Sequence, residues 1–288
     1  MSINRQNQFL GDELSAAEND ATSAKFVIIP CGLEKTVSYG TGAANGPDAI
    51  IAASHQLERL VEGREPCLQG MFTQTPIDCS QSMEAIQSEL RARTLEIAGR
   101  GNVPVTLGGE HSLSYGAVMG VADASPEPIG LVQIDAHADF RVDYQGHKHS
   151  HASVMQLLAK EGLPICSFGV RALAQEEQEG RQSHGVICYD APHLVRQQIH
   201  SVELPDDFPK KIYITFDVDG LDPSVLSATG TPVPGGLGFY QSLDLIQSTL
   251  KGRECVGMDI VELAPLQGQP VSDFTAALIL HHLMAMTL

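Results

Sequence analysis

Short apolar runs alternate with longer stretches of helical periodicity along this chain, after a polar and acidic segment at residues 1–24. Each run is rich in β-branched residues and nearly continuous in its apolar character, which is typical of a strand covered on both faces of a sheet. The runs that we predict to be strands lie at Lys25–Pro30, Val103–Leu107, Ile129–Ile134, Ile165–Val170, Val186–Tyr189, Lys211–Phe216 and Cys255–Ile260.

Two of the intervening stretches have clear helical character, at Met83–Gly99 and Ser272–Met286. Alternation of strands and helices over the whole length predicts an α/β fold, with a parallel sheet and helices on both of its faces. No linker or repeat interrupts the pattern, so we predict a single domain over residues 25–288 and an arm across its surface at residues 1–24. The apolar stripe of the first helix is predicted to contain Met83, Ile86, Leu90, Leu95 and Ala98.

Composition agrees with this fold class and narrows the possible ligands. Hydrophobic residues make up 43% of the 288 residues and Trp is absent, which suits a core of aliphatic side chains. The chain carries 18 Lys and Arg against 35 Asp and Glu, a formal net charge of -17. Nucleic-acid binding depends largely on neutralising phosphates with basic residues, so this balance argues against it and favours cationic ligands or metal ions.

The six cysteines are scattered and form no C-x-x-C pair. A chain of this length needs no disulfide to stabilise its core, so we expect reduced thiols. The first residues are polar and lack the apolar segment of a signal peptide, and no stretch approaches the ~20 apolar residues of a membrane span. These features predict a cytoplasmic protein without a membrane partner.

Potential metal ligands follow three of the predicted strands. Asp135, His137 and Asp139 come directly after Ile129–Ile134, and their i, i+2, i+4 spacing points them the same way while the chain stays extended. The other ligands are Asp217 and Asp219 after Lys211–Phe216, and His111 after Val103–Leu107. Because parallel α/β sheets bind ligands at the carboxyl ends of their strands, we expect these six side chains to converge.

Four carboxylates and two imidazoles buried together repel one another and lose their hydration unless cations lie among them. Two divalent ions match the four negative charges. An oxygen-rich site with some imidazole and no thiolate suits Mn²⁺ better than structural Zn²⁺. Two ions ~3.5–4 Å apart activate a bridging water, so the pattern predicts a hydrolase.

The ordered motifs GGEHS, DAHAD, SHAS, FDVDGLDPS and MDIVELAP resemble those of the ureohydrolase family, which includes arginase, agmatinase, guanidinobutyrase and formiminoglutamase. The resemblance runs from about Tyr39 to the C-terminus. It implies a three-layer α/β/α fold around a mainly parallel eight-stranded sheet, two Mn²⁺ per subunit, and hydrolysis of a guanidino group to urea and an amine. It also implies a homo-oligomer, a trimer or a hexamer.

The resemblance implies four ligands for the first metal ion: His111, Asp135, Asp139 and Asp217. It implies four for the second, two of them shared: Asp135, His137, Asp217 and Asp219. Asp139 is then expected to pass a proton to the departing amine, and Glu262 in MDIVELAP to pair with the guanidinium. His151 in SHAS resembles the proton-shuttling histidine of the family. His147 and His149 alternate with it in GHKHSH and are expected to be exposed, although either could serve instead.

The substrate tail is less clearly specified. The residues around the DAHAD and VELAP motifs are most similar to those of bacterial and archaeal agmatinases, so agmatine is the expected substrate. Arg141 favours a carboxylate tail instead, as in 4-guanidinobutyrate or formiminoglutamate, unless Asp143 neutralises it. Aminopropylagmatine and arginine stay open as alternatives. A non-enzymatic regulatory relative predicts a substituted ligand, whereas all six ligand positions are intact.

Overall fold

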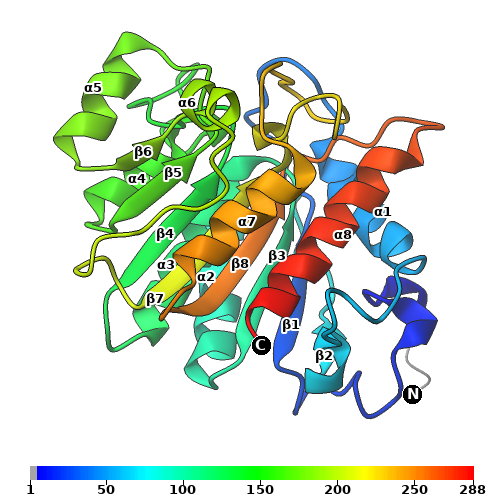
Figure 1. Cartoon of the computed structure of the whole chain (residues 1–288). Helices are drawn as coiled ribbons and strands as arrows, with labels where there is room; N and C mark the ends of the chain where they lie inside the picture. The colour runs from blue at the N-terminus through cyan, green and yellow to red at the C-terminus, as the bar shows by residue number, and fades with distance from the viewer. Residues whose placement is uncertain (1–4) are drawn as a thin grey trace.

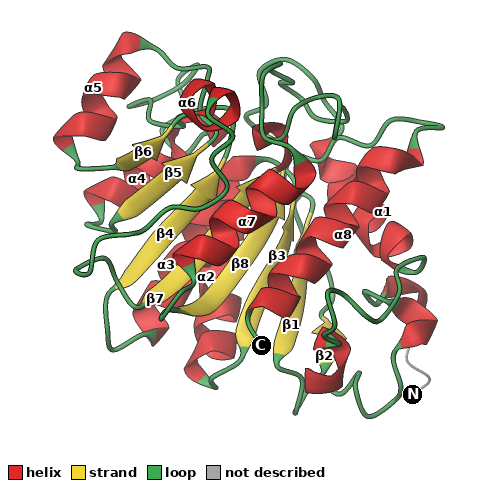
Figure 2. Cartoon of the chain, in the orientation of Figure 1, coloured by secondary structure: helices red, strands yellow, loops and turns green. Residues whose placement is uncertain are grey.

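In this computed structural model, which describes residues 5–288, eight parallel strands form one sheet (Figures 1 and 2). The strand order is β2-β1-β3-β8-β7-β4-β5-β6. The strands are β1 Phe26–Cys31, β2 Met71–Thr73, β3 Val103–Gly108, β4 Ile129–Ile134, β5 Ile165–Phe168, β6 Ile187–Tyr189, β7 Lys211–Asp217 and β8 Glu254–Val261. The predicted α/β fold with a parallel sheet is confirmed.

Helices cover both faces of this sheet and make the fold three-layered. Helices α1, α6, α7 and α8 pack on one face, and α2, α3 and α4 pack on the other, while α5 lies beside the β6 edge (Figure 1). Their bounds are α1 Gly46–Ser54, α2 Met83–Gly99, α3 Ser114–Ala124, α4 Val154–Lys160, α5 Gln175–Ser183, α6 Ala191–Arg196, α7 Phe239–Thr249 and α8 Pro270–Met286. In the part of the chain that the structure describes, no helix has the length and apolar character needed to cross a membrane.

Alternate residues of a central strand such as β7 supply the two halves of the core. In β7, Ile212 and Ile214 join the cluster under α7 and α8, whereas Tyr213 between them joins the cluster under α3 and α4. All of these side chains are fully buried. Burial on both faces explains why the strands read as continuous apolar runs rather than as alternating ones.

The segment before β1 does more than lie across the surface. Phe9 and Leu10 are fully buried in the main core. The side-chain amide of Gln8 donates to the carbonyl of Thr73 at 3.1 Å and accepts from its N–H at 2.9 Å. These bonds satisfy the outer edge of β2, an edge strand that would otherwise expose unpaired backbone groups. Residues 1–4 of the predicted arm lie outside the described residues.

The short strand β2 has no counterpart among the predicted runs, because three residues are too few to show a hydrophobic pattern.

Helix α2 has the predicted bounds, and Ser82 caps it by accepting from the N–H of Ala85. Its predicted stripe is wrong at Leu95, which is 39% exposed. The residue before it, Thr94, is buried instead, together with Ile97, because these two continue the helical spacing from Leu90.

Candidate metal centre and pocket

Polar side chains from four adjacent strands meet at the carboxyl edge of the sheet. His111 follows β3 and Glu262 follows β8, while Asp217 ends β7 and Asp219 lies in the turn directly after it. The β4 strand leads into the other three predicted ligands, Asp135, His137 and Asp139. All are buried except His137, which is partly exposed. The structure therefore brings together the six side chains that the sequence pattern singles out.

The turn after β3 is held tightly against the rest of the edge. Gly109 permits this approach, because a Cβ there would lie 2.1 Å from the carbonyl oxygen of Leu33. Two residues further on, the N–H of His111 donates to Glu262 Oε1 at 2.7 Å. Glu262 N in turn donates to the carbonyl of Gly109 at 2.8 Å. These contacts fix the position of the His111 backbone.

A hydroxyl and a carboxylate group orient the imidazole of His111 through its Nε2 atom. Its Nε2 lies 2.8 Å from Thr215 Oγ1, and that hydroxyl donates to Asp259 Oδ1 at 2.7 Å. Because the single hydroxyl proton is used on Asp259, Thr215 accepts from His111, and the Nε2 atom of His111 carries a proton. The Nδ1 atom is then left facing the carboxylates.

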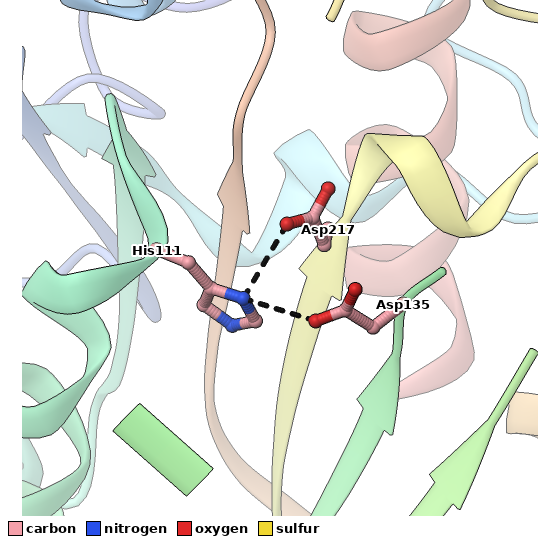
Figure 3. Close-up of side chains that lie close together, drawn as sticks. All are labelled: His111, Asp135 and Asp217. Atoms are coloured by element: carbon pink, nitrogen blue, oxygen red, sulfur yellow. Dashed lines mark ion pairs between the residues drawn. The ribbon is translucent and has the colours of Figure 1, made fainter. Parts of the chain in front are cut away.

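Three carboxylate oxygens surround this Nδ1 atom. They lie at 3.2 Å (Asp135), 3.0 Å (Asp139) and 3.4 Å (Asp217), and Nδ1 has no hydrogen-bond partner other than these charged contacts. Figure 3 shows Asp135 and Asp217 pointing at His111 from neighbouring strands. A nitrogen lone pair facing three carboxylates is repulsive unless a proton or a metal cation lies between them. The arrangement therefore fits a metal ion.

A second group of donors lies beside the first. His137 Nδ1 is 3.0 Å from Asp219 Oδ2 and 3.6 Å from Asp135 Oδ1. Two sets of potential ligand atoms, each within 4.8 Å of one another, result: His111 with Asp135 and Asp217, and Asp135 with His137 and Asp219. Asp135 belongs to both sets, so the described residues can hold two cations that share one carboxylate.

The titration behaviour of the cluster reflects its crowding. Burial, followed by the charge of Asp135, raises the pKa of Asp139 to about 7. Burial, followed by the charge of Asp219, raises the pKa of Asp217 well above its usual range. Burial opposes the charge on His111, but its carboxylate contacts outweigh this effect and hold its pKa well above the ordinary value. The crowding of charges therefore favours a cation among these side chains.

Two residues of the site adopt a left-handed backbone conformation that non-glycine residues rarely take. Asp139 has φ 53° and Glu262 has φ 65°. Such positions cost free energy and persist where the surrounding structure fixes them. At Asp139 the fixing contacts are bonds from the N–H groups of Met155 and Gln156 to its carbonyl.

A pocket of about 570 Å³ opens over this cluster. Asp139, His137 and His151 line it, and Tyr144 and Leu173 add apolar surface. Asp217 and Glu262 are not among its lining residues. A small ligand in the pocket would therefore meet both charged or imidazole groups and hydrocarbon surface.

His151 is fixed at the pocket wall by Thr36. The Oγ1 atom of Thr36 lies 3.1 Å from His151 N and 3.2 Å from His151 Nδ1, and it donates its proton to Glu110 Oε1 at 2.7 Å. Glu110 is fully buried and also accepts from the N–H groups of Lys35 and Thr36. His151 Nε2 lies 3.4 Å from the exposed Ser38 Oγ. Burial lowers the pKa of His151.

The other two candidate histidines lie elsewhere. His147 is exposed, as predicted. The prediction is wrong for His149, which is partly buried because its ring packs edge-on against Tyr115 at 5.4 Å. Neither histidine lines the pocket.

Arg141 lies at the pocket wall, but its charge is paired. Its guanidinium is 3.0 Å from Glu176 and 3.7 Å from Glu177, and it stacks over the ring of Tyr144 at 5.4 Å. Glu177 is held in turn by the N–H groups of Phe140 and Ala174. These two glutamates, rather than Asp143, neutralise Arg141.

Comparison with known proteins agrees with this geometry. The sequence model of the arginase family matches residues 24–286. The chain belongs to the arginase family.

Relatives within the family align over nearly the whole chain. N(1)-aminopropylagmatine ureohydrolase of Synechocystis is 33% identical and covers 96% of this chain and 92% of its own length. A protein of the same name from Thermus thermophilus is 35% identical and covers 92% of each chain. The crystal structure of agmatine ureohydrolase of Thermoplasma volcanium superposes with a TM-score of 0.82 at 30% identity, covering 95% of this chain and 93% of that one. This chain is an arginase-family ureohydrolase, an enzyme that hydrolyses carbon–nitrogen bonds.

Several residues that support the site in this arginase-family chain were not identified from the sequence. Asp259 accepts from Thr215 and from Tyr213, at 2.7 and 2.9 Å. Gln133 Nε2 donates to Asp135 Oδ2 at 2.8 Å. The available signal was a polar side chain inside an apolar strand run, as Gln133 in IGLVQI and Asp259 in CVGMDI are. Thr36 gave no such signal, because it lies in a loop.

Proposed function

We propose that this chain hydrolyses the guanidino group of a linear guanidino amine, releasing urea and an amine, with two Mn²⁺ ions at the carboxyl edge of the sheet. The observation that carries the proposal is the buried cluster of two imidazoles and four carboxylates beneath a pocket. Its donor set of oxygen and nitrogen atoms without sulfur supports Mn²⁺. When bound, such a pair of ions supplies a hydroxide nucleophile at neutral pH.

The proposed ligands divide into two sets around shared carboxylates. His111, Asp135, Asp139 and Asp217 would hold one ion. Asp135, His137, Asp217 and Asp219 would hold the other. The proton on His111 Nε2 leaves Nδ1 free to act as a ligand. Gln133, bonded to Asp135, keeps that carboxylate directed into the cluster.

Proton movement is assigned to two residues that line the pocket. Asp139 receives the proton of the attacking water and delivers it to the departing amine. His151 exchanges protons with solvent through Nε2, since Nδ1 is engaged with Thr36.

Glu262 is proposed to orient the guanidinium. Its burial raises its pKa to about 8, which suits a carboxylate that gains a cationic partner.

The charge of the pocket supports a cationic tail. Arg141 is balanced by Glu176 and Glu177, so it leaves no unpaired positive charge for a carboxylate tail. The ring of Tyr144 and the side chain of Leu173 suit a polymethylene chain. Agmatine, the substrate expected from the sequence motifs, has this chemistry.

N(1)-aminopropylagmatine is the second candidate and shares the same guanidino end. The names of two relatives at 33% and 35% identity favour it. A pocket of about 570 Å³ has room for the longer tail.

The test is urea release by the Mn²⁺-loaded protein with agmatine, N(1)-aminopropylagmatine, arginine and 4-guanidinobutyrate, compared by kcat/KM. We expect one of the two polyamine precursors to exceed arginine and 4-guanidinobutyrate by at least ~10-fold, about 1.4 kcal/mol of discrimination. Preference for 4-guanidinobutyrate would contradict the cationic-tail assignment. Absence of urea from all four would contradict the proposed reaction.

A further inference from the structure

Two cysteines that are 48 residues apart in the sequence lie in contact, and neither is a ligand of the proposed metal centre. The sulfur atoms of Cys31 and Cys79 are 3.7 Å apart. Cys31 ends β1 and is fully buried, whereas Cys79 is partly exposed on the loop between β2 and α2. We propose that this pair is an oxidation site, at which a peroxide converts the two thiols into an intramolecular disulfide.

The surroundings of Cys31 and Cys79 favour formation of a disulfide bond between them. A disulfide requires the sulfur atoms to approach to about 2.05 Å. Cys31 is held within the sheet, because it pairs with Gly108 of β3. Cys79 belongs to a loop that is anchored to β1 on its other side, where Ile77 N donates to the carbonyl of Pro30 at 2.9 Å. The loop therefore holds Cys79 against Cys31, and the Cys79 sulfur also contacts the carbonyl of Ile77 at 3.6 Å.

The two thiols have different chemical roles. The hydrogen bond from Cys31 lowers the pKa of Cys79, and the charge of Lys35 acts in the same direction. The contact with Cys79, together with burial, raises the pKa of Cys31 well above its ordinary value. Its partial exposure and its lower pKa identify Cys79 as the sulfur that a peroxide reaches first.

The reaction then balances in two steps. The Cys79 thiolate attacks one oxygen of hydrogen peroxide, which breaks the O–O bond, forms a sulfenic acid and releases hydroxide. The sulfur of Cys31 attacks the Cys79 sulfur, which forms the S–S bond, and its proton leaves with the displaced hydroxide as water. The hydroxide released in the first step takes up the proton that Cys79 lost on ionisation, so two thiols and one peroxide give one disulfide and two waters overall.

The remaining cysteines provide internal controls. Cys67, Cys166 and Cys255 are buried, and Cys188 is exposed. No sulfur–sulfur contact other than that of Cys31 with Cys79 is found among the described cysteines. An exposed thiol without a partner is expected to overoxidise rather than to form an intramolecular bond.

The experiment treats the full, reduced protein with hydrogen peroxide, blocks remaining thiols with N-ethylmaleimide after denaturation, and maps the peptides by mass spectrometry. We expect a reducible link between the Cys31 and Cys79 peptides within one chain. Cys188→Ser should keep this link, and Cys79→Ser should abolish it. Recovery of Cys67 and Cys166 as free thiols shows that the fold stayed intact during oxidation.

Two results would overturn the proposal. One is recovery of Cys79 as sulfinic acid while Cys31 remains a free thiol in the same sample. The other is a link that appears only when Cys67 and Cys166 are also modified, because the pair then reacts only in unfolded chains. Neither result depends on the proposed ureohydrolase activity, which urea release measures separately.

Discussion

The hydroxyl oxygen of Thr36 contacts His151 at two atoms, the backbone nitrogen at 3.1 Å and the ring Nδ1 at 3.2 Å. Because this hydroxyl donates its proton to Glu110, it accepts at both contacts, and the Nδ1 atom of His151 is protonated. One threonine in a loop thereby selects the tautomer of a histidine in the pocket wall, and leaves Nε2 as the atom that exchanges protons.

Replacing Thr36 by Val removes this acceptor. We expect kcat for urea release to fall about 10-fold, equivalent to ~1.4 kcal/mol. The acid limb of the pH–kcat profile should also move to lower pH, since the lost hydrogen bond favoured the protonated ring. Mn²⁺ content should not change. Thr36→Ser keeps the hydroxyl and serves as the matched control. A Val variant with the wild-type pH profile would argue against Thr36 as a positioning residue.

Replacing Thr215 by Val tests the support behind His111. The variant leaves Nε2–H without its acceptor and deprives Asp259 of a donor, so the imidazole is no longer fixed in the ligand tautomer. Loss of such outer contacts typically weakens metal binding by about 10–100-fold. Isothermal titration with Mn²⁺ measures this directly, with Thr215→Ser as the control. Equal affinity in the Val and Ser variants would contradict the argument.

Asp139→Asn keeps the shape of the side chain while removing its charge and its capacity to carry a proton. We expect kcat to fall between about 10²-fold and 10⁴-fold, the usual contribution of acid–base catalysis. Thermal denaturation of the same preparations reports whether the fold survives. Wild-type turnover in a folded Asn variant would remove Asp139 from the mechanism.

The ion pairs of Arg141 predict a change in substrate preference. Glu176→Gln removes the exposed partner at 3.0 Å and leaves Arg141 less neutralised. The ratio of kcat/KM for 4-guanidinobutyrate to that for agmatine should then rise several-fold. Arg141→Gln should lower the same ratio, because the glutamates then face the pocket unpaired. Ratios that move together in the two variants would show that this pair does not set the local charge.

The stability of the protein should fall at acidic pH because of His281. This residue of α8 is fully buried, neither ring nitrogen has a hydrogen-bond partner, and burial lowers its pKa to about 4. The unfolded chain binds a proton near pH 6.5 and the folded chain only near pH 4, so acidification through this window favours unfolding. The free energy of unfolding should decrease by up to about 3 kcal/mol from this residue.

Urea denaturation at pH 7 and pH 4.5, for wild type and His281→Leu, isolates this effect from the titration of carboxylates. The variant should lose less stability between the two pH values. The prediction fails if the two proteins lose the same amount.

The central part of the fold could be predicted from the sequence because its strands are long apolar runs that recur along the chain. Ile129–Ile134 was placed at its observed bounds, since six buried residues in succession leave a clear pattern. The candidate ligands were identified because strand ends in a parallel sheet meet at one edge, so Asp135 and Asp217 were expected near each other without knowledge of the strand order.

Features that depend on single contacts between distant segments could not be predicted. Strand β2 exists because β1 lies on one side of it and Gln8 satisfies Thr73 on the other. The link from Thr36 to Glu110 spans 74 residues, and no periodicity marks either partner. Leu95 was wrongly assigned to the buried stripe of α2, because a leucine beside the stripe cannot be distinguished by residue type from a leucine within it.

The left-handed backbone at Asp139 and Glu262 has a consequence for how this enzyme is maintained over evolutionary time. Glycine or asparagine would adopt the backbone conformation of either residue at a lower cost in free energy. The like charges of the cluster also oppose folding. Under the proposed mechanism, a substitution that relieved the strain would give a more stable chain with less activity. A copy of the protein that is released from selection for activity is therefore expected to lose its site before it loses its fold.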